Sequence, residues 1–594
     1  MNIRHMRFLR TTSCLVILSC LFVSCKPTQK TGGHPSSKPE INTVDLSRRF
    51  VDACKEKIKG NLELAVNGFN DCLHLDPSMA AAHYELAGLY NSQERNDLAL
   101  DHAKYAAEAD PGNEWYLLLY AQILQETHKP AESAAAYQKL IKLQPEKLDY
   151  FYGYSDALLF EGKYKEAIHV YEEIEVKTGP SEDLSLQKAK VYERIGETEK
   201  AETEINKLIK DNPGETKYYV TLAQMFQDRA DTYKAKGNKA KENEAIEKKH
   251  QVYLSLLKTD SANPVAHLAL ADYYVGRDRY DSAFAEHKAA LSNPDLDIDS
   301  KVKVALSYYY ASEKDSKVKQ QCEDLCQIIT TLHPTEAKGH AVFADFLYRE
   351  KRLPEARTEY RKSVENDKSK YVLWNQLLII DSELNDYTDM APDSKEAIEL
   401  FPSMPIPYFF SGLALIQQHT YTEAIDILNS GLIYVVDNKA LESQFYSTLG
   451  DAFYKTREYT KSDDAYDKAL AIDPDNSYVL NNYSYYLSLR NENLEKAEKM
   501  AKRANELEPA NVNFQDTYAW VLYRLGKYDQ ALEWMDKVFA VNADPGAVML
   551  EHYGDILFRL NRKDEAFAYW LKAKLKGGNS EMLLKKLADK KLYE

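Results

Sequence analysis

Apolar residues recur through most of this chain at spacings of three and four positions, and short polar breaks separate the runs. That spacing gathers the apolar residues on one face of an α-helix. Only 22 of the 594 residues are Gly and 20 are Pro, which is few for a β-rich or loop-rich protein. The pattern therefore predicts a long series of amphipathic helices.

Small residues interrupt the apolar pattern with a period close to 34 positions. One series is Ala65, Ala99, Ser133, Ala167 and Ala201, and it returns as Ser462, Ala497, Ala531 and Ala566. A second series is Ala53, Ala87, Ala121, Ser155 and Ala189, followed by Ala344, Gly412, Gly450, Ala519 and Gly554. Small side chains let the two helices of a hairpin approach closely. Prolines end many units, because proline cannot continue a helix.

These positions resemble the tetratricopeptide repeat family, whose motif has a small residue in each of two helices and a closing proline. Residues 80–113 show it through Ala87, Ala99 and Pro111, and residues 512–545 show it through Ala519 and Ala531. The resemblance implies an all-α fold, a tetratricopeptide-repeat α-α superhelix or solenoid of about fifteen units. A terminal helix would cover its last apolar face.

Two stretches depart from the repeat. Residues 229–250 are Lys-rich and predict helices that lengthen around a turn at Gly237, either as a solvated extension or as a docking surface. In residues 381–407 the pattern dissolves around four prolines, and we expect a kink there that joins two arms. The predicted organisation is a lipoprotein signal peptide (1–24), a lipidated cysteine with a flexible tether (25–43), an N-terminal array (44–380), a Pro-rich irregular repeat (381–407), a C-terminal array (408–579) and a capping helix (580–594).

The first residues resemble a bacterial export signal. Three arginines precede an apolar run at 13–23 that is too short to span a bilayer comfortably. Residues 21–25 (LFVSC) resemble a lipobox, in which Cys25 becomes the acylated first residue. An ordinary signal peptide with an incidental cysteine is the alternative. The resemblance implies a firm anchor of several acyl chains, followed by a tether that would reach roughly 20–25 Å as a flexible coil.

The net charge of the chain and the residues after Cys25 indicate which partners it meets and where. The formal net charge of −16 disfavours nucleic acid, because an acidic chain is repelled by phosphate backbones. The whole chain resembles tetratricopeptide lipoproteins of Bacteroidetes, in which acidic residues directly after the acylated cysteine direct export to the cell surface. Here no acid occurs between Cys25 and Glu40. The resemblance therefore implies an outer-membrane lipoprotein that faces the periplasm.

No pattern in the sequence indicates catalysis. The chain has no HExxH, GxSxG, Walker or GxGxxG motif, and histidines such as His267, His287 and His340 are scattered singly. Outside the signal and Cys25 the cysteines are Cys54, Cys72, Cys322 and Cys326, which lack zinc spacing; a Cys54–Cys72 disulfide stays open. We expect no enzyme activity, cofactor, metal or small-molecule substrate.

In the family that the chain resembles, the first helix of each hairpin lines the concave face. Carried over by position, this predicts a partner-binding surface of Asn481, Tyr485, Asp516, Trp520, Tyr523, Arg524, Glu551, Asp555, Phe558 and Arg559. Aromatic rings interleaved with polar groups suit an extended peptide. Arg524 and Arg559, 35 positions apart, would form a basic pair for a carboxylate. Packing of these residues between helices is the alternative.

The predicted function is a protein–protein interaction scaffold or assembly factor, tethered to the envelope by its N-terminal lipid and binding a partner protein or peptide on its concave face. Two alternatives share this fold. The chain would be a secretion or gliding component that links a periplasmic motor to an outer-membrane translocon, or it would position a cell-wall enzyme.

Overall fold

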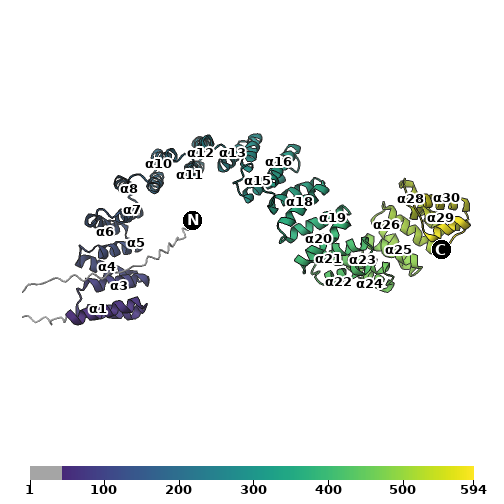
Figure 1. The fold of residues 1–594 in the computed structure, drawn as a ribbon, viewed down its shortest axis with the longest axis horizontal. Helices are drawn as coiled ribbons and strands as arrows, with labels where there is room; N and C mark the ends of the chain where they lie inside the picture. Colours follow the sequence, from purple (N-terminus) through teal and green to yellow (C-terminus); the bar gives the residue numbers. More distant parts are fainter. Residues whose placement is uncertain (1–42, 594) are drawn as a thin grey trace, which may run out of the picture. The chain divides into compact units, whose positions relative to one another are not determined.

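The structure is a computed structural model, and it describes residues 43–593 (Figure 1). The predicted signal peptide, Cys25 and nearly all of the tether lie outside the described residues. The described part contains 31 α-helices and no strand. The prediction of an all-α fold is confirmed.

The chain divides into two compact units, Met1–Asn212 and Pro213–Glu594. The helices of the first unit are α1 (Thr43–Ile58), α2 (Leu62–Leu75), α3 (Ala80–Ser92), α4 (Asn96–Ala109), α5 (Glu114–Glu126), α6 (Pro130–Leu143), α7 (Leu148–Glu161), α8 (Tyr164–Thr178), α9 (Glu182–Ile195) and α10 (Thr198–Asp211).

The helices of the second unit are α11 (Thr216–Ala235), α12 (Lys239–Thr259), α13 (Pro264–Val275), α14 (Tyr280–Leu291), α15 (Ile298–Ala311), α16 (Ser316–Leu332), α17 (Ala337–Arg349), α18 (Leu353–Asn366), α19 (Tyr371–Glu383), α20 (Tyr387–Leu400), α21 (Pro405–Gln417), α22 (Tyr421–Leu432), α23 (Lys439–Lys455), α24 (Tyr459–Ile472), α25 (Ser477–Arg490), α26 (Leu494–Leu507), α27 (Val512–Arg524), α28 (Tyr528–Val541), α29 (Ala547–Arg559), α30 (Lys563–Leu575) and α31 (Glu581–Asp589).

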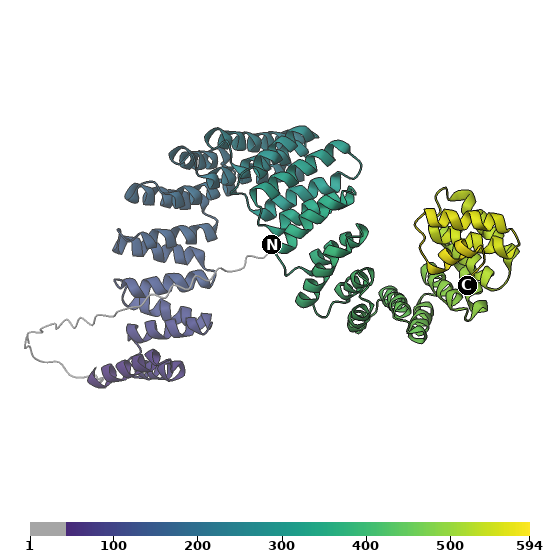
Figure 2. The same cartoon turned by 45° about the vertical axis from the view of Figure 1, so that its right-hand side comes forward.

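Consecutive helices pair as hairpins, α1 with α2 and so on to α29 with α30, and each hairpin packs on its neighbours within a unit (Figure 2). The described helices thus form fifteen hairpins, and α31 packs against α30 after the last one. This arrangement confirms the predicted tetratricopeptide-type solenoid.

The small residues lie where the two helices of a hairpin touch. Ala65, Ala99 and Ala201 are fully buried in the first unit, as are Ala497 and Ala566 in the second. In two hairpins a serine occupies the same place, and its hydroxyl is satisfied across the hairpin. Ser133 Oγ donates to the carbonyl of Ala121 at 2.8 Å, and Ser462 Oγ donates to the carbonyl of Gly450 at 2.8 Å. The period seen in the sequence is therefore the contact between paired helices.

Most of residues 381–407, which the sequence predicted as a Pro-rich irregular repeat, are helical. Helix α20 contains Pro392 and packs on both α19 and α21. Pro405 and Pro407 lie in the first turn of α21, where a helix needs no bonded N–H and proline is therefore tolerated. A kink between two arms stays a prediction, as do the boundaries of the predicted domains.

The lengthened hairpin in residues 229–250 is confirmed. Helices α11 and α12 have 20 and 21 residues, and Gly237 between them adopts a φ of +68° that favours glycine. Cys54, Cys72, Cys322 and Cys326 are free thiols in this structure. No helix among residues 43–593 is long and apolar enough to cross a membrane.

Candidate functional site

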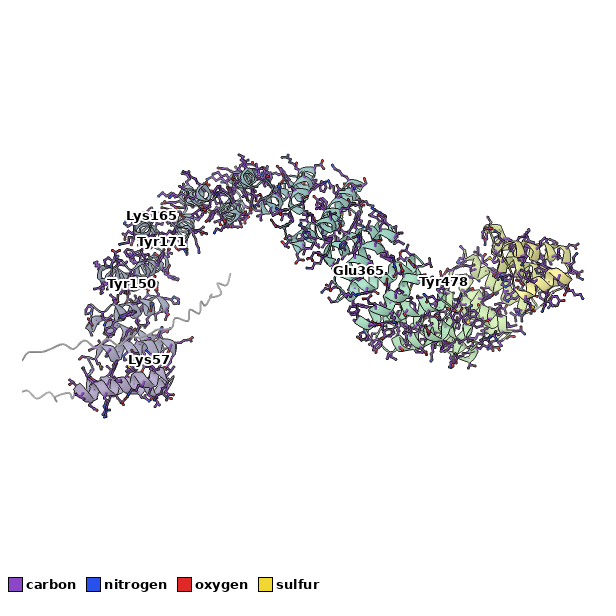
Figure 3. All side chains as sticks on the ribbon, viewed as in Figure 1. Lys57, Tyr150, Lys165, Tyr171, Glu365 and Tyr478 are labelled. Atoms are coloured by element: carbon purple, nitrogen blue, oxygen red, sulfur yellow. The ribbon has the colours of Figure 1, made fainter. Side chains whose placement is uncertain are left out.

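Helices α25, α27 and α29 are the first helices of the last three hairpins, and α27 contacts both α25 and α29 directly. Tyr478, labelled in Figure 3, begins this contact at the start of α25, where its ring meets the edge of Phe514 on α27 at 5.4 Å. Six side chains on these helices form what we call the C-terminal cluster: Asn481, Tyr485, Asp516, Trp520, Arg524 and His552.

An aromatic stack forms the centre of the C-terminal cluster. The Trp520 ring lies flat on His552, with centroids 4.0 Å apart and an interplanar angle of 16°. Its other neighbour is Tyr523 at 4.7 Å, also stacked. Tyr485 approaches His552 from α25 at 6.3 Å. Residues from three hairpins therefore meet at one ring, and their relative positions are fixed by stacking.

A carboxylate, Asp516, lies beside the stack and contacts His552. His552 Nδ1 lies 3.1 Å and 3.3 Å from the two carboxylate oxygens of Asp516, so the imidazole donates at that nitrogen. Burial, followed by the negative charge of Asp516, raises the pKa of the Tyr485 hydroxyl. Tyr485 therefore stays a neutral phenol at physiological pH.

Three polar atoms of the C-terminal cluster are buried without a hydrogen-bond partner: Trp520 Nε1, Arg524 Nε and Asn481 Oδ1. Trp520 and Asn481 are each 8% exposed. An unsatisfied buried polar group costs on the order of 1–3 kcal/mol, so such groups are rare and several in one place indicate a ligand. Two of the three are donors, which favours an acceptor on the ligand.

Arg524 differs from other arginines at the same position of the repeat. Arg349 ends α17 as Arg524 ends α27, and its guanidinium donates to the carbonyl of Tyr309 at 2.7 Å and to Ser312 Oγ at 2.5 Å. Arg490 ends α25 and pairs with Asp463 at 2.7 Å. Nε lacks a hydrogen-bond partner in all three arginines, but among the described residues only Arg524 of the three has no ion-pair partner. It is a half-buried cation that its own chain does not neutralise.

Four residues of the predicted partner-binding surface make contacts with neighbouring helices instead of with the C-terminal cluster. Asp555 is 2% exposed and accepts from Trp570 Nε1 at 2.8 Å and from Lys586 Nζ at 2.6 Å. Burial raises its pKa to about 6, although Lys586 opposes the shift. Glu551 binds the same Lys586 at 2.9 Å, and Phe558 stacks near Trp570 at 5.5 Å. The guanidinium of Arg559 lies 5.9 Å from the Tyr528 ring. These contacts tie α29 to the neighbouring helices α28, α30 and α31.

The sequence did not single out His552, although it is the ring on which the stack is built. It is a lone histidine beside Glu551, and nothing in its local pattern shows that the ring reaches α27. The sequence also cannot show which polar atoms lack a hydrogen-bond partner, because that depends on residues that are distant in the chain.

Other histidines serve the fold. In His267 the two ring nitrogens contact Glu286 at 2.6 Å and the carbonyl of Ser261 at 3.0 Å, and in His340 they contact Glu359 at 2.6 Å and the carbonyl of Pro334 at 3.0 Å. The two sets of partners are equivalent in the repeat. Within residues 43–593, no group of three or more His, Cys, Asp or Glu side chains is placed to hold a metal ion.

Known proteins resemble the chain through its repeats. A model described as tetratricopeptide repeat matches residues 407–575, and a second model with that description matches residues 59–114 and 118–183. Tetratricopeptide repeat protein 21B of Xenopus laevis is 23% identical over 323 residues, which are 52% of this chain and 23% of that protein. The TPR repeat-containing protein YpiA of Bacillus subtilis (strain 168) is 28% identical over 139 residues, 23% of this chain and 32% of that one.

The chain thus spans less than a third of the length of either of these relatives. Among solved structures, the APC/C hetero-tetramer Cut9-Hcn1 has 12% identity and a TM-score of 0.36, covering 86% of this chain and 96% of its own. A tetratricopeptide repeat protein from Parabacteroides merdae ATCC 43184 has 16% identity and a TM-score of 0.28, covering 49% of this chain and 99% of its own.

Proposed function

We propose that this chain, a tetratricopeptide repeat protein, is a non-catalytic scaffold that holds a partner protein against its C-terminal cluster from a lipid anchor in a bacterial envelope. Repeats of this kind generally serve as protein-interaction scaffolds. The observation that carries the site is the set of unpartnered donors at Trp520 and Arg524. The fold alone would not select this face over any other.

The partner's chemistry follows from these donors. A carboxylate of the partner, from an acidic side chain or a chain end, would accept from the Arg524 guanidinium and from Trp520 Nε1. Arginine–carboxylate bonds are charge-assisted and geometrically specific. The Asp516 carboxylate is held in place by its contact with His552 Nδ1. The stacked rings would cover an apolar side chain next to the carboxylate.

A photo-cross-linking amino acid at Tyr485 tests the site in living cells. Benzoylphenylalanine there, on the α25 side of the stack, should give one or a few defined adducts with envelope proteins. The same probe at Phe160, which is 77% exposed on α7, is the matched control. Adducts that occur at Tyr485, are absent at Phe160 and disappear with Arg524→Ala would support the proposal. Identical adducts at both positions, or none at Tyr485, would contradict it.

The anchor and location rest on the sequence of the first 25 residues. Metabolic labelling with an alkyne fatty acid should mark the wild-type protein and leave Cys25→Ala unlabelled, with the variant released from the membrane fraction. Labelling that persists in Cys25→Ala would refute the anchor. The identity of the Tyr485 adducts would separate a general scaffold from a secretion or gliding component and from a partner of a cell-wall enzyme.

A further inference from the structure

A pocket of about 440 Å³ lies where the lengthened hairpin meets the next one. Helices α11 and α12 have 20 and 21 residues, whereas α13 and α14 have 12 each. At 1.5 Å per residue, the first part of α12 therefore extends roughly 13 Å beyond the end of α13. This step between long and short helices leaves a hollow lined by α11, α12 and α13.

A buried histidine lines this pocket without a complete set of partners. His250 is 8% exposed, and its Nδ1 has no hydrogen-bond partner. Its ring lies flat against Tyr273 at 3.9 Å and 8°, and Tyr273 is itself held by a 2.7 Å bond from its hydroxyl to Glu247. Burial lowers the pKa of His250, so the imidazole is uncharged at neutral pH. The stacked rings of His250 and Tyr273 thus give the pocket one uncharged, polar wall.

The positive charges of the lining are already engaged by the protein. Lys249 Nζ donates to Gln227 Oε1 at 2.9 Å. The guanidinium of Arg277 lies 5.0 Å from the Tyr273 ring centroid and 4.0 Å from Glu247. Arg277 therefore lies beside a carboxylate, and Lys249 is held by a hydrogen bond to a neutral amide.

The negative charges of the lining are not engaged. Glu242 on α12 and Asp272 on α13 both line the pocket, and neither has an ion-pair partner among the described residues. Glu244 on the same helix α12, by contrast, pairs with Lys248 at 3.7 Å. Two unpaired carboxylates and a neutral imidazole favour a cationic ligand over an anionic one.

We propose that this pocket is a second docking site, which takes a basic side chain, arginine or lysine, from a protein partner and binds it through Glu242 and Asp272. This site is separate from the C-terminal cluster and has the opposite charge preference. On this proposal the lengthened hairpin α11–α12 is more than a solvated extension, because the difference in length between it and α13–α14 forms the pocket. Deviation from a regular repeat is typical of functional positions.

Selection of phage-displayed random 12-residue peptides against the purified chain 26–594 tests the inference. Selected sequences should divide into an Arg- or Lys-containing class and a class that depends on the C-terminal cluster. The synthetic form of a basic peptide, measured by fluorescence anisotropy, should bind at least about tenfold more weakly to Glu242→Gln/Asp272→Asn, which corresponds to about 1.4 kcal/mol.

The matched control is Glu244→Gln/Asp278→Asn, which removes the same charge on the same hairpins outside the pocket lining. It should change the affinity less than about twofold, and Arg524→Ala should leave it unchanged. Equal unfolding temperatures of the two double variants would exclude loss of fold as the cause. A selection without basic peptides, or one whose basic peptides bind both double variants equally, would overturn the proposal without affecting the proposal for the C-terminal cluster.

Discussion

Arg349 and Arg524 occupy the same position in two hairpins of one array, yet their surroundings differ. Arg349 covers the Tyr309 ring at 4.0 Å and donates to two oxygens of the preceding hairpin. Arg524 follows a tryptophan stack and has no ion-pair partner among the described residues, although Nε lacks a hydrogen-bond partner in both arginines. The repeat therefore supplies a basic group at a fixed place, and the neighbouring hairpin decides whether that group holds the fold together or stays available for a partner.

The contrast extends to the acids around each arginine. In the hairpins α17–α18 and α19–α20, Arg357 binds both Asp381 and Asp389 at 2.5 Å, and Arg361 binds Asp393. Around the C-terminal cluster the nearby Asp516 is bound by His552 and is not paired with Arg524. Charged groups that already pair with each other within the array are not free to bind a charged ligand, whereas an unpaired arginine is.

Gly554→Leu should disrupt the hairpin α29–α30, and with it both the stability of the array and the C-terminal cluster. A Cβ on Gly554 would lie 2.5 Å from Trp570 Cδ1 and 3.1 Å from the carbonyl of Ala566, so α29 and α30 must separate. We expect a loss of about 3 kcal/mol in the free energy of unfolding. Partner binding should fall as well, because α29 also carries His552. Gly546→Ala is the control, since a Cβ there meets nothing within 4 Å. Equal denaturant midpoints for the two variants would show that the hairpin contact is misplaced.

Stability should depend on pH through the ion-pair network of α18–α20. Burial raises the pKa of Asp381 to about 7, against the opposing Arg357. The folded chain then holds a proton that the unfolded chain releases, so the free energy of unfolding decreases as pH rises from about 4 to about 7, by on the order of 2 kcal/mol. Asp393 also faces this carboxyl; Asp386 and Asp389 face its partner Arg357, and Arg361 binds Asp393.

Asp381→Asn removes that proton exchange. The variant should gain stability relative to wild type at pH 8 compared with pH 5, as measured by urea unfolding at both pH values. Asp544→Asn, an exposed residue whose side chain is 79% accessible, should show no such change. A wild-type midpoint that rises between pH 5 and pH 7 in step with Asp381→Asn would mean that Asp381 is ionised throughout.

Arg349→Ala should cost about 1–2 kcal/mol, because it removes two charge-assisted hydrogen bonds and a ring contact between hairpins. Thermal unfolding measures the loss. Proteins cross-linked at Tyr485 should be unchanged in this variant. A loss of those adducts without any change in the unfolding temperature would place Arg349 in a binding surface instead of the fold.

Trp520→Phe should have the smallest effect on the fold. It deletes an unpartnered N–H, which is favourable, and puts a smaller ring against His552, which is unfavourable, so the free energy of unfolding should change by less than about 1 kcal/mol. Binding of the partner should weaken, since the N–H is one of the two donors. Trp520→Phe with full binding would limit the site to Arg524.

The sequence predicted the repeat well because the constraint is local. A small residue is required wherever two helices of a hairpin cross, and the requirement recurs every 34 positions at Ala65, Ala99 and Ala201. At residues 381–407, where four prolines predicted an irregular repeat, the sequence did not show that most of the segment is helical. The tolerance of the first helical turn for Pro405 and Pro407 depends on the exact start of α21, which composition does not show.

The candidate site was predictable only in part. Position in the repeat located Trp520 and Arg524 on one surface, but it could not distinguish Arg524 from Asp555, which a lysine on α31 neutralises. That lysine lies 31 positions further along the chain. Whether a polar group is satisfied depends on such distant partners, and the same reason hid His552 and the pocket beside α12.

The most direct test of the account is cross-linked co-purification from isolated envelopes with Arg524→Gln and Arg349→Gln side by side, each quantified by mass spectrometry and accompanied by its unfolding temperature. The account predicts that Arg524→Gln loses a defined set of envelope proteins at an unchanged unfolding temperature, whereas Arg349→Gln unfolds earlier and keeps the set. An Arg524→Gln protein that retains every partner would contradict the claim that this unpaired arginine holds them.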